Sequence, residues 1–222
     1  MPAFDLLICD CDGVLVDSEI ISHRVLFDAL TRYVPAETLE PLLKDTFGLT
    51  VPVILEQIER EFGLGIPASF DDDLRAESEA RVKAEVEPIA GAREALLAID
   101  LPLAVASNSR RHNVLSSLER AGLTERVAGN LFSADMVTHP KPAPDVYLLA
   151  AERMGVAPSR CLVVEDSTTG ATAALAAGMT VLGFTGASHI QPGHDRILKA
   201  LCVHDTFDDM ARLPALVAEL RR

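Results

Sequence analysis

Basic residues are scarce relative to acidic ones in this chain. Lys and Arg together number 20, against 33 Asp and Glu, so the formal net charge is −13 at pH 7. An electrostatic field of that sign repels nucleic acid and anionic lipid, so neither is an expected partner. It also repels phosphate, so a phosphate-binding site here needs local positive charge from a metal ion, a lysine or a helix N-terminus.

Long apolar runs and metal-binding cysteine patterns are also missing. No apolar span approaches the length of a membrane helix, and the first residues lack a basic region followed by an apolar stretch. The four cysteines, at 9, 11, 161 and 202, fit no zinc pattern, and two of them lie in or beside an apolar run as small hydrophobes. These absences predict a soluble, reduced, cytoplasmic protein that does not bind membranes.

Four short apolar runs predict the strands of a sheet. They cover residues 6–9, 103–106, 161–164 and 180–184. Continuous apolar runs of this length are typical of buried strands in parallel sheets. Helical spacing of apolar residues occupies the intervals between them, over about 92–99, 114–121, 144–154 and 168–177. The alternation predicts an α/β fold with a Rossmann-like parallel sheet, built from residues 1–16 and 88–222.

Residues 17–87 break this alternation, because they contain no convincing strand. Helices are predicted over residues 18–31, 53–62 and 71–87, the first capped by Asp17 or Ser18. Prolines at 35, 41, 52 and 67 are expected at the joints between helices. The stretch therefore predicts an inserted helical domain of about seventy residues.

Polar side chains follow three of the four predicted strands. Asp10 and Asp12 follow the first, Ser107 and Asn108 the second, and Glu165 and Asp166 the third, as the sequence shows. Ligands of open parallel sheets bind outside the carboxyl ends of the strands, so these side chains are expected to converge. Lys141, in a loop between two prolines, adds one positive charge.

This collection of residues suits phosphoryl transfer. Carboxylates are ligands that Mg²⁺ prefers. Lys141, Ser107 and the backbone N–H groups near Gly13 would neutralise the phosphoryl oxygens. An aspartate such as Asp10 can also attack phosphorus as a covalent nucleophile.

Each segment taken alone has a simpler interpretation. An Asp-x-Asp-Gly after a strand is often only a turn, and the segments at 107–109 and 165–167 resemble helix caps. Lys141 alone would be a solvated lysine. A calcium loop does not fit, because Gly13 comes too early and no Glu closes the loop. The order of all four segments along the chain favours a single site.

Four segments carry a family resemblance whose order and spacing fit the whole chain. They are Asp10 to Glu19, Ser107 to Ser109, Lys141 to Asp145, and Val164 to Ser167. The chain resembles the haloacid dehalogenase superfamily of hydrolases, in the branch that includes β-phosphoglucomutase and sugar-phosphate phosphatases. The resemblance implies a Rossmann-like core with a helical cap domain, residues 17–87, inserted after the first strand.

The resemblance also implies roles for the residues at the strand ends. Asp10 is the nucleophile that forms an aspartyl-phosphate. Asp12 protonates the leaving oxygen and then activates the water that hydrolyses the intermediate. The residues expected to hold the phosphoryl group are Ser107, Lys141, Asn108 and Gly13. Asp166, with Asp10 and the backbone carbonyl of Asp12, is expected to bind Mg²⁺, supported by Glu165.

Within the superfamily, a phosphatase is favoured over the alternatives. Dehalogenases lack an acid at the position of Asp12, whereas a phosphate ester has a poor leaving group that gains from a general acid. Val51 stands where a β-phosphoglucomutase has a cap arginine, and His23 falls one residue later than the mutase's cap histidine. Both departures disfavour the mutase. A non-catalytic binding protein is disfavoured because the nucleophile and metal carboxylates are present.

The substrate is expected to be a small phosphorylated metabolite: a hexose phosphate, a sugar-acid phosphate or a polyol phosphate. His23 and Gly48 are candidate substrate contacts, although His23 is equally explained as an ordinary helix residue. His189 and His194 follow the fourth predicted strand and either border the site or lie on the surface. A monomer is expected, because the cap must open and close.

Overall fold

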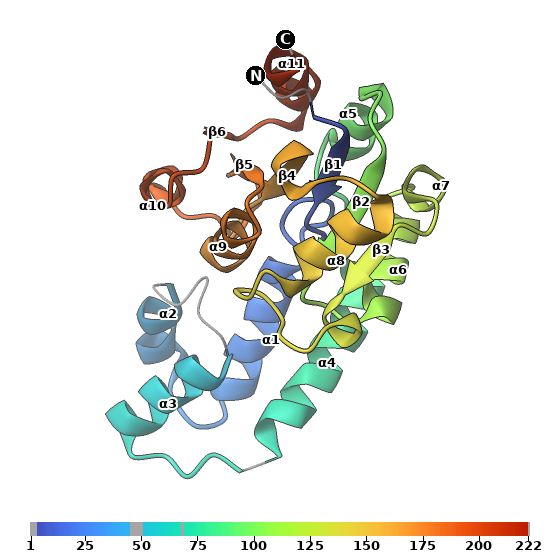
Figure 1. Ribbon diagram of the computed structural model, residues 1–222. Coiled ribbons are helices and arrows are strands. Elements are labelled where there is room, and N and C mark those ends of the chain that lie inside the picture. Colours follow the sequence, from blue (N-terminus) through green and yellow to red (C-terminus); the bar gives the residue numbers. More distant parts are fainter. Residues whose placement is uncertain (1–3, 45–50, 68, 222) are drawn as a thin grey trace. The chain divides into compact units, whose positions relative to one another are not determined.

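The computed structural model describes residues 4–44, 51–67 and 69–221 (Figure 1). The chain divides into two compact units, one formed by Met1–Asp17 with Glu87–Arg222 and the other by Ser18–Val86. The strands are β1 Leu6–Cys9, β2 Leu103–Ser107, β3 Leu131–Ser133, β4 Cys161–Glu165, β5 Thr180–Phe184 and β6 Asp205–Phe207. The α-helices are α1 Glu19–Leu30, α2 Ala36–Lys44, α3 Val51–Phe62, α4 Phe70–Glu85, α5 Ala92–Ala98, α6 Arg111–Arg120, α7 Thr124–Val127, α8 Asp145–Met154, α9 Thr168–Ala176, α10 His194–Ala200 and α11 Leu213–Leu220.

The first unit is built on a sheet with the order β3-β2-β1-β4-β5-β6, in which every neighbouring pair is parallel. Strands are added toward one edge from β1 to β3, and toward the other from β4 to β6. Right-handed crossovers therefore place α5 and α6 on one face and α8, α9 and α10 on the other. This is the Rossmann-like order, so the predicted α/β class is confirmed.

The four predicted strands are β1, β2, β4 and β5, and β1, β2 and β4 are buried along their whole length. On one face, Ile8, Ala106 and Val163 from neighbouring strands belong to one core cluster with residues of α8, α9 and α10. Helix α9 contributes Ala171, Ala173 and Ala174 to this cluster. Small side chains let that helix pack closely on the sheet. Its N-terminus lies near the end of β4 because α9 begins at Thr168, three residues after β4 ends.

Strands β3 and β6 and helices α2, α7, α10 and α11 were not predicted. Strands β3 and β6 are three residues each and form the edges of the sheet, so they are too short to show a period of two. Helix α2 was missed because Pro41, expected at a joint, lies inside it. Pro52, also expected at a joint, is the second residue of α3, where the missing N–H would have no helical partner.

The second unit holds α1 to α4 around its own apolar core. Helix α1 contributes Val25 and Leu30, α3 contributes Ile58 and α4 contributes Leu74 to one buried cluster. Ser18 takes the predicted N-cap position of α1, but its side chain makes no capping hydrogen bond. Across the described residues of both units, no helix combines the length and apolarity needed to cross a membrane.

Candidate active site

The polar residues predicted at the strand ends come from three adjacent strands. Cys9 in β1 is level with Val105 in β2 and with Val164 in β4. The backbone N–H of Asp10 then donates to the Val164 carbonyl at 3.0 Å. Asp10, Ser107 and Glu165 therefore emerge side by side, at the point where the direction of strand addition reverses.

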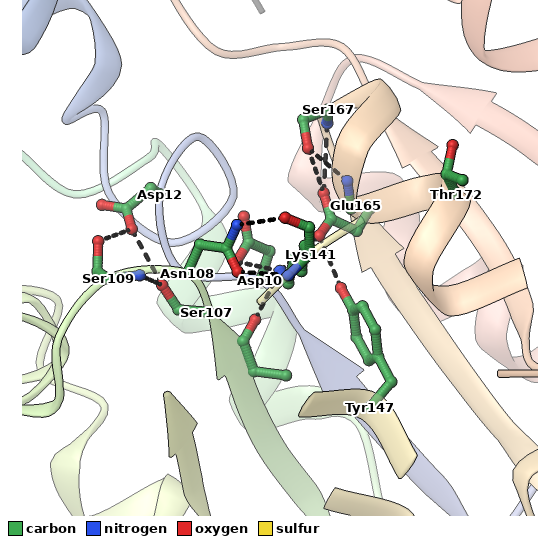
Figure 2. A network of polar contacts seen from close by, with 12 residues as sticks. Asp10, Asp12, Ser107, Asn108, Ser109, Lys141, Tyr147, Glu165, Ser167 and Thr172 are labelled. Carbon is green, nitrogen blue, oxygen red and sulfur yellow. Dashed lines mark hydrogen bonds and ion pairs between the residues drawn. The ribbon is translucent and has the colours of Figure 1, made fainter. Parts of the chain in front are cut away.

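Lys141 is buried at the centre of this group. Its Nζ donates to Asp10 Oδ1 at 2.8 Å, to Glu165 Oε1 at 2.7 Å and to the Ala106 carbonyl at 2.9 Å (Figure 2). An ammonium has three N–H donors, so all three are used. Asn108 holds the Lys141 backbone, accepting from its N–H at 2.9 Å and donating to its carbonyl at 3.1 Å. The ammonium is thus fixed against the Asp10 carboxylate.

Glu165 is fully buried, and both of its carboxylate oxygens are occupied. Besides Lys141, Oε1 accepts from the Tyr147 hydroxyl at 2.6 Å, and Oε2 accepts from Ser167 Oγ at 3.1 Å. A Cβ on Gly170 would lie 1.7 Å from Oε1, so α9 can pass this close only with glycine there. Ser167 also caps α9, as its hydroxyl accepts from the Gly170 N–H.

Tyr147 was not predicted as a site residue, although its ring centroid lies 4.9 Å from Lys141 Nζ and its hydroxyl donates to Glu165. It is completely buried in the first turn of α8. In the sequence it looks like one more apolar position of that helix. Its partner lies 18 residues away, so no local pattern marks the contact.

The balance of charge at this site is negative. Carboxylate oxygens of Asp10, Glu165 and Asp166 all lie within 4.8 Å of one another, with the Lys141 ammonium against two of these carboxylates. Burial raises the pKa of Asp10 and of Asp166, the Glu165 charge raises both further, and Lys141 opposes the rise. Burial lowers the pKa of Lys141, but Asp10 and Glu165 outweigh that effect and keep it charged. Such a cluster with unbalanced negative charge fits a divalent cation such as Mg²⁺. Both Glu165 oxygens already accept hydrogen bonds, so Asp10 and Asp166 are the candidate carboxylate ligands.

Asp12 has a different environment from Asp10, two residues away. Its Oδ2 accepts from Ser109 Oγ at 2.7 Å and from Ser107 Oγ at 3.2 Å (Figure 2). The Asp12 carboxylate is not among the three that cluster within 4.8 Å of one another. The predicted metal contact of Asp12 is its backbone carbonyl, which stays a prediction. Ser109 was not predicted as a site residue, and its N–H also donates to Ser107 Oγ at 2.9 Å.

Of the two candidate substrate contacts in the helical insert, only His23 lies among the described residues. His23 lies in α1, where its Nε2 is 3.0 Å from the Leu43 carbonyl oxygen within the same unit. This contact gives His23 a structural role, and its role toward a substrate stays a prediction. Gly48 lies outside the described residues. Val51, where a mutase has arginine, begins α3.

Replacing Lys141 tests whether the ammonium balances the buried carboxylates. Lys141→Ala should lower the free energy of unfolding by about 3–5 kcal/mol, because Asp10 and Glu165 lose their shared cation in a buried site. Urea unfolding in EDTA measures this. Lys199→Ala is the matched control, because Lys199 forms an exposed pair with Asp195 that is worth roughly 1 kcal/mol or less. Equal losses for the two variants would contradict the buried pairing.

Known proteins resemble this chain in sequence and in structure. Residues 4–178 match the haloacid dehalogenase-like hydrolase family. A 6-phosphogluconate phosphatase of Escherichia coli is 29% identical over 218 residues, which span 97% of this chain and 96% of that protein.

Two solved structures extend the likeness to the fold. A haloacid dehalogenase-like protein of unknown function from Agrobacterium tumefaciens is 38% identical, with a TM-score of 0.91 over 99% of this chain and 100% of that one. A hydrolase of the same family from Deinococcus radiodurans, with bound phosphate and sodium, is 32% identical. Its TM-score is 0.82 over 99% of this chain and 97% of that one. The match to the family covers more than half of the chain, and the four predicted motifs lie within it. This protein is therefore an enzyme of the haloacid dehalogenase-like hydrolase family.

Proposed function

We propose that this hydrolase is a Mg²⁺-dependent phosphatase of a small sugar-phosphate-like monoester, acting through an aspartyl-phosphate on Asp10. The observation that carries the proposal is the convergence of Asp10, Lys141 and the Glu165–Asp166 pair at adjacent strand ends. A nucleophilic carboxylate, a fixed cation and a set of oxygen donors for a metal are the parts that phosphoryl transfer needs.

The acidic cluster is the proposed metal site. Asp10 and Asp166 supply carboxylate oxygens, with the backbone carbonyl of Asp12. Glu165 already accepts hydrogen bonds from Lys141, Tyr147 and Ser167, so its proposed role is to position these residues around the metal site. A bound Mg²⁺ neutralises charge on the phosphoryl oxygens and on the carboxylates around it.

Asp10 and Asp12 divide the chemistry between them. In the first step an Asp10 oxygen bonds to phosphorus, the bond to the leaving oxygen breaks, and Asp12 gives that oxygen a proton. In the second step Asp12 takes a proton from water, the water oxygen bonds to phosphorus, and Asp10 is released with inorganic phosphate. The hydroxyls of Ser107 and Ser109 hold Asp12 outside the acidic cluster, where it can exchange protons.

The substrate class is proposed from the relatives. The E. coli relative is named for 6-phosphogluconate, a phosphorylated sugar acid. In the proposed chemistry, the residues at the strand ends act on the phosphoryl group and its leaving oxygen, which all of these esters share. Selection among sugar, sugar-acid and polyol phosphates is therefore assigned to the helical domain, residues 17–87, in which His23 and Gly48 are the proposed contacts.

Phosphate release from a panel of such esters, in Mg²⁺ and in EDTA, tests this function. The expected result is Mg²⁺-dependent phosphate release from one or a few esters of the panel, because the helical domain is proposed to select among substrates. If the release depends on the carboxylate of Asp10, Asp10→Asn should abolish it. Asp5→Asn, at a carboxylate that pairs with Arg160 on the surface, is the matched control and should not.

Two other outcomes would overturn the phosphatase. Conversion of β-glucose 1-phosphate to the 6-phosphate, without release of inorganic phosphate, would show a mutase that does not need an arginine at position 51. Absence of hydrolysis for every ester, with Mg²⁺ present and the protein folded, would favour a binding protein.

A further inference from the structure

Two histidines from one segment of the core contact the same aspartate. His189 and His194 both lie in the stretch between β5 and the first turn of α10. His189 Nε2 lies 3.2 Å from Asp166 Oδ2, and both side chains are buried. His194 Nε2 lies 2.6 Å from the Asp166 backbone carbonyl oxygen. The side chain and the main chain of Asp166 are thus each held by an imidazole.

Gly13 completes the packing around this aspartate. Its φ is +75°, and a Cβ there would lie 2.0 Å from Asp166 Oδ2 and 3.0 Å from His189 Cε1. The aspartate and the imidazole therefore already fill the space where any other residue would place its side chain. Segments that follow β1, β4 and β5 therefore meet in close contact at this point.

We infer that His189 and His194 are positioning residues for Asp166, which set the affinity of the acidic cluster for its divalent cation. The inference rests on the proposed function, because it takes Asp166 as a ligand of that cation. A carboxylate has two oxygens, so one can accept the His189 N–H while the other faces the cation. Fixing the carboxylate in advance removes the cost of ordering it when the cation binds.

The size of the effect follows from other metal sites. Partners that hydrogen-bond a metal-ligating group typically contribute 10- to 100-fold in metal affinity. His189 should account for an effect of about this size, since it is buried and contacts the carboxylate itself. His194 acts through the backbone carbonyl, so its removal should shift Asp166 less directly and weaken binding by a smaller factor.

The experiment is a calorimetric titration of the protein with MgCl₂ alone, without substrate. His189→Met fills the space but has no N–H donor, and its Kd for Mg²⁺ should rise about 10- to 100-fold. His189→Gln restores a side-chain N–H donor and should recover most of the affinity. His204→Ala, at an exposed histidine of the core, is the matched control and should bind like wild type.

The outcomes separate this inference from the function on which it rests. A wild-type protein that binds Mg²⁺ while His189→Met binds equally well or more tightly would overturn the positioning role and leave the phosphatase intact. A wild-type protein that hydrolyses its substrate fully in EDTA and binds no Mg²⁺ would overturn the metal site and the inference together. A folded His189→Met with weakened binding, rescued in His189→Gln, supports it.

Discussion

Asp10→Asn should reduce kcat by roughly 10⁴-fold or more, because loss of the nucleophile in covalent catalysis costs on this order. The amide has nearly the shape of the carboxylate and keeps an oxygen toward Lys141. It also removes one of the like charges that burial and Glu165 already disfavour, which is why the pKa of Asp10 is raised. The fold should therefore survive. Phosphate release with the best substrate of the panel, together with the thermal midpoint, measures both effects.

Asp5→Asn makes the same chemical change at a surface carboxylate that pairs with Arg160, and it should leave kcat unchanged. Substantial turnover by a carefully purified Asp10→Asn enzyme would remove Asp10 as the nucleophile. A large loss of stability in that variant, matching the loss of turnover, would instead indicate that Asp10 serves the fold.

Asp12→Ala should separate the two chemical steps. Acetyl phosphate carries a good leaving group that needs no general acid, so Asp10 should still become phosphorylated. Hydrolysis of the intermediate needs a base, so it should slow by about 10²- to 10⁴-fold. The phosphorylated enzyme should then accumulate, and intact-protein mass spectrometry after brief exposure to acetyl phosphate would detect one added phosphoryl group.

Ser109→Ala is a milder change at the same place. Ser109 donates a hydrogen bond to Asp12 at 2.7 Å but takes part in neither chemical step. It should slow turnover by a smaller factor and accumulate less intermediate. The double variant Asp10→Asn/Asp12→Ala should not be labelled. If Asp12→Ala itself fails to label, Asp12 is required for the first step in a way that leaving-group protonation does not explain.

The site was predictable to the extent that its residues stand at the ends of strands. Short apolar runs ending in Asp10, Ser107 and Glu165 mark both the strands and the candidate site, because parallel strands share one carboxyl edge. The orientation of each side chain was not predictable. Asn108 holds the Lys141 backbone, a contact that nothing in the sequence indicated, and its predicted contact with phosphate stays a prediction.

Local periodicity in the sequence was enough to predict the α/β class, because it depends on neighbouring positions. The same kind of local pattern indicated the inserted helical stretch and the candidate reactive residues, whose roles stay predictions. Tertiary structure alone decided which groups meet. Tyr147 reaches Glu165, Gly170 makes room for that carboxylate, and His189 reaches Asp166, all through contacts between separate elements. Such contacts depend on how helices pack against the sheet, and packing is set by the whole chain at once.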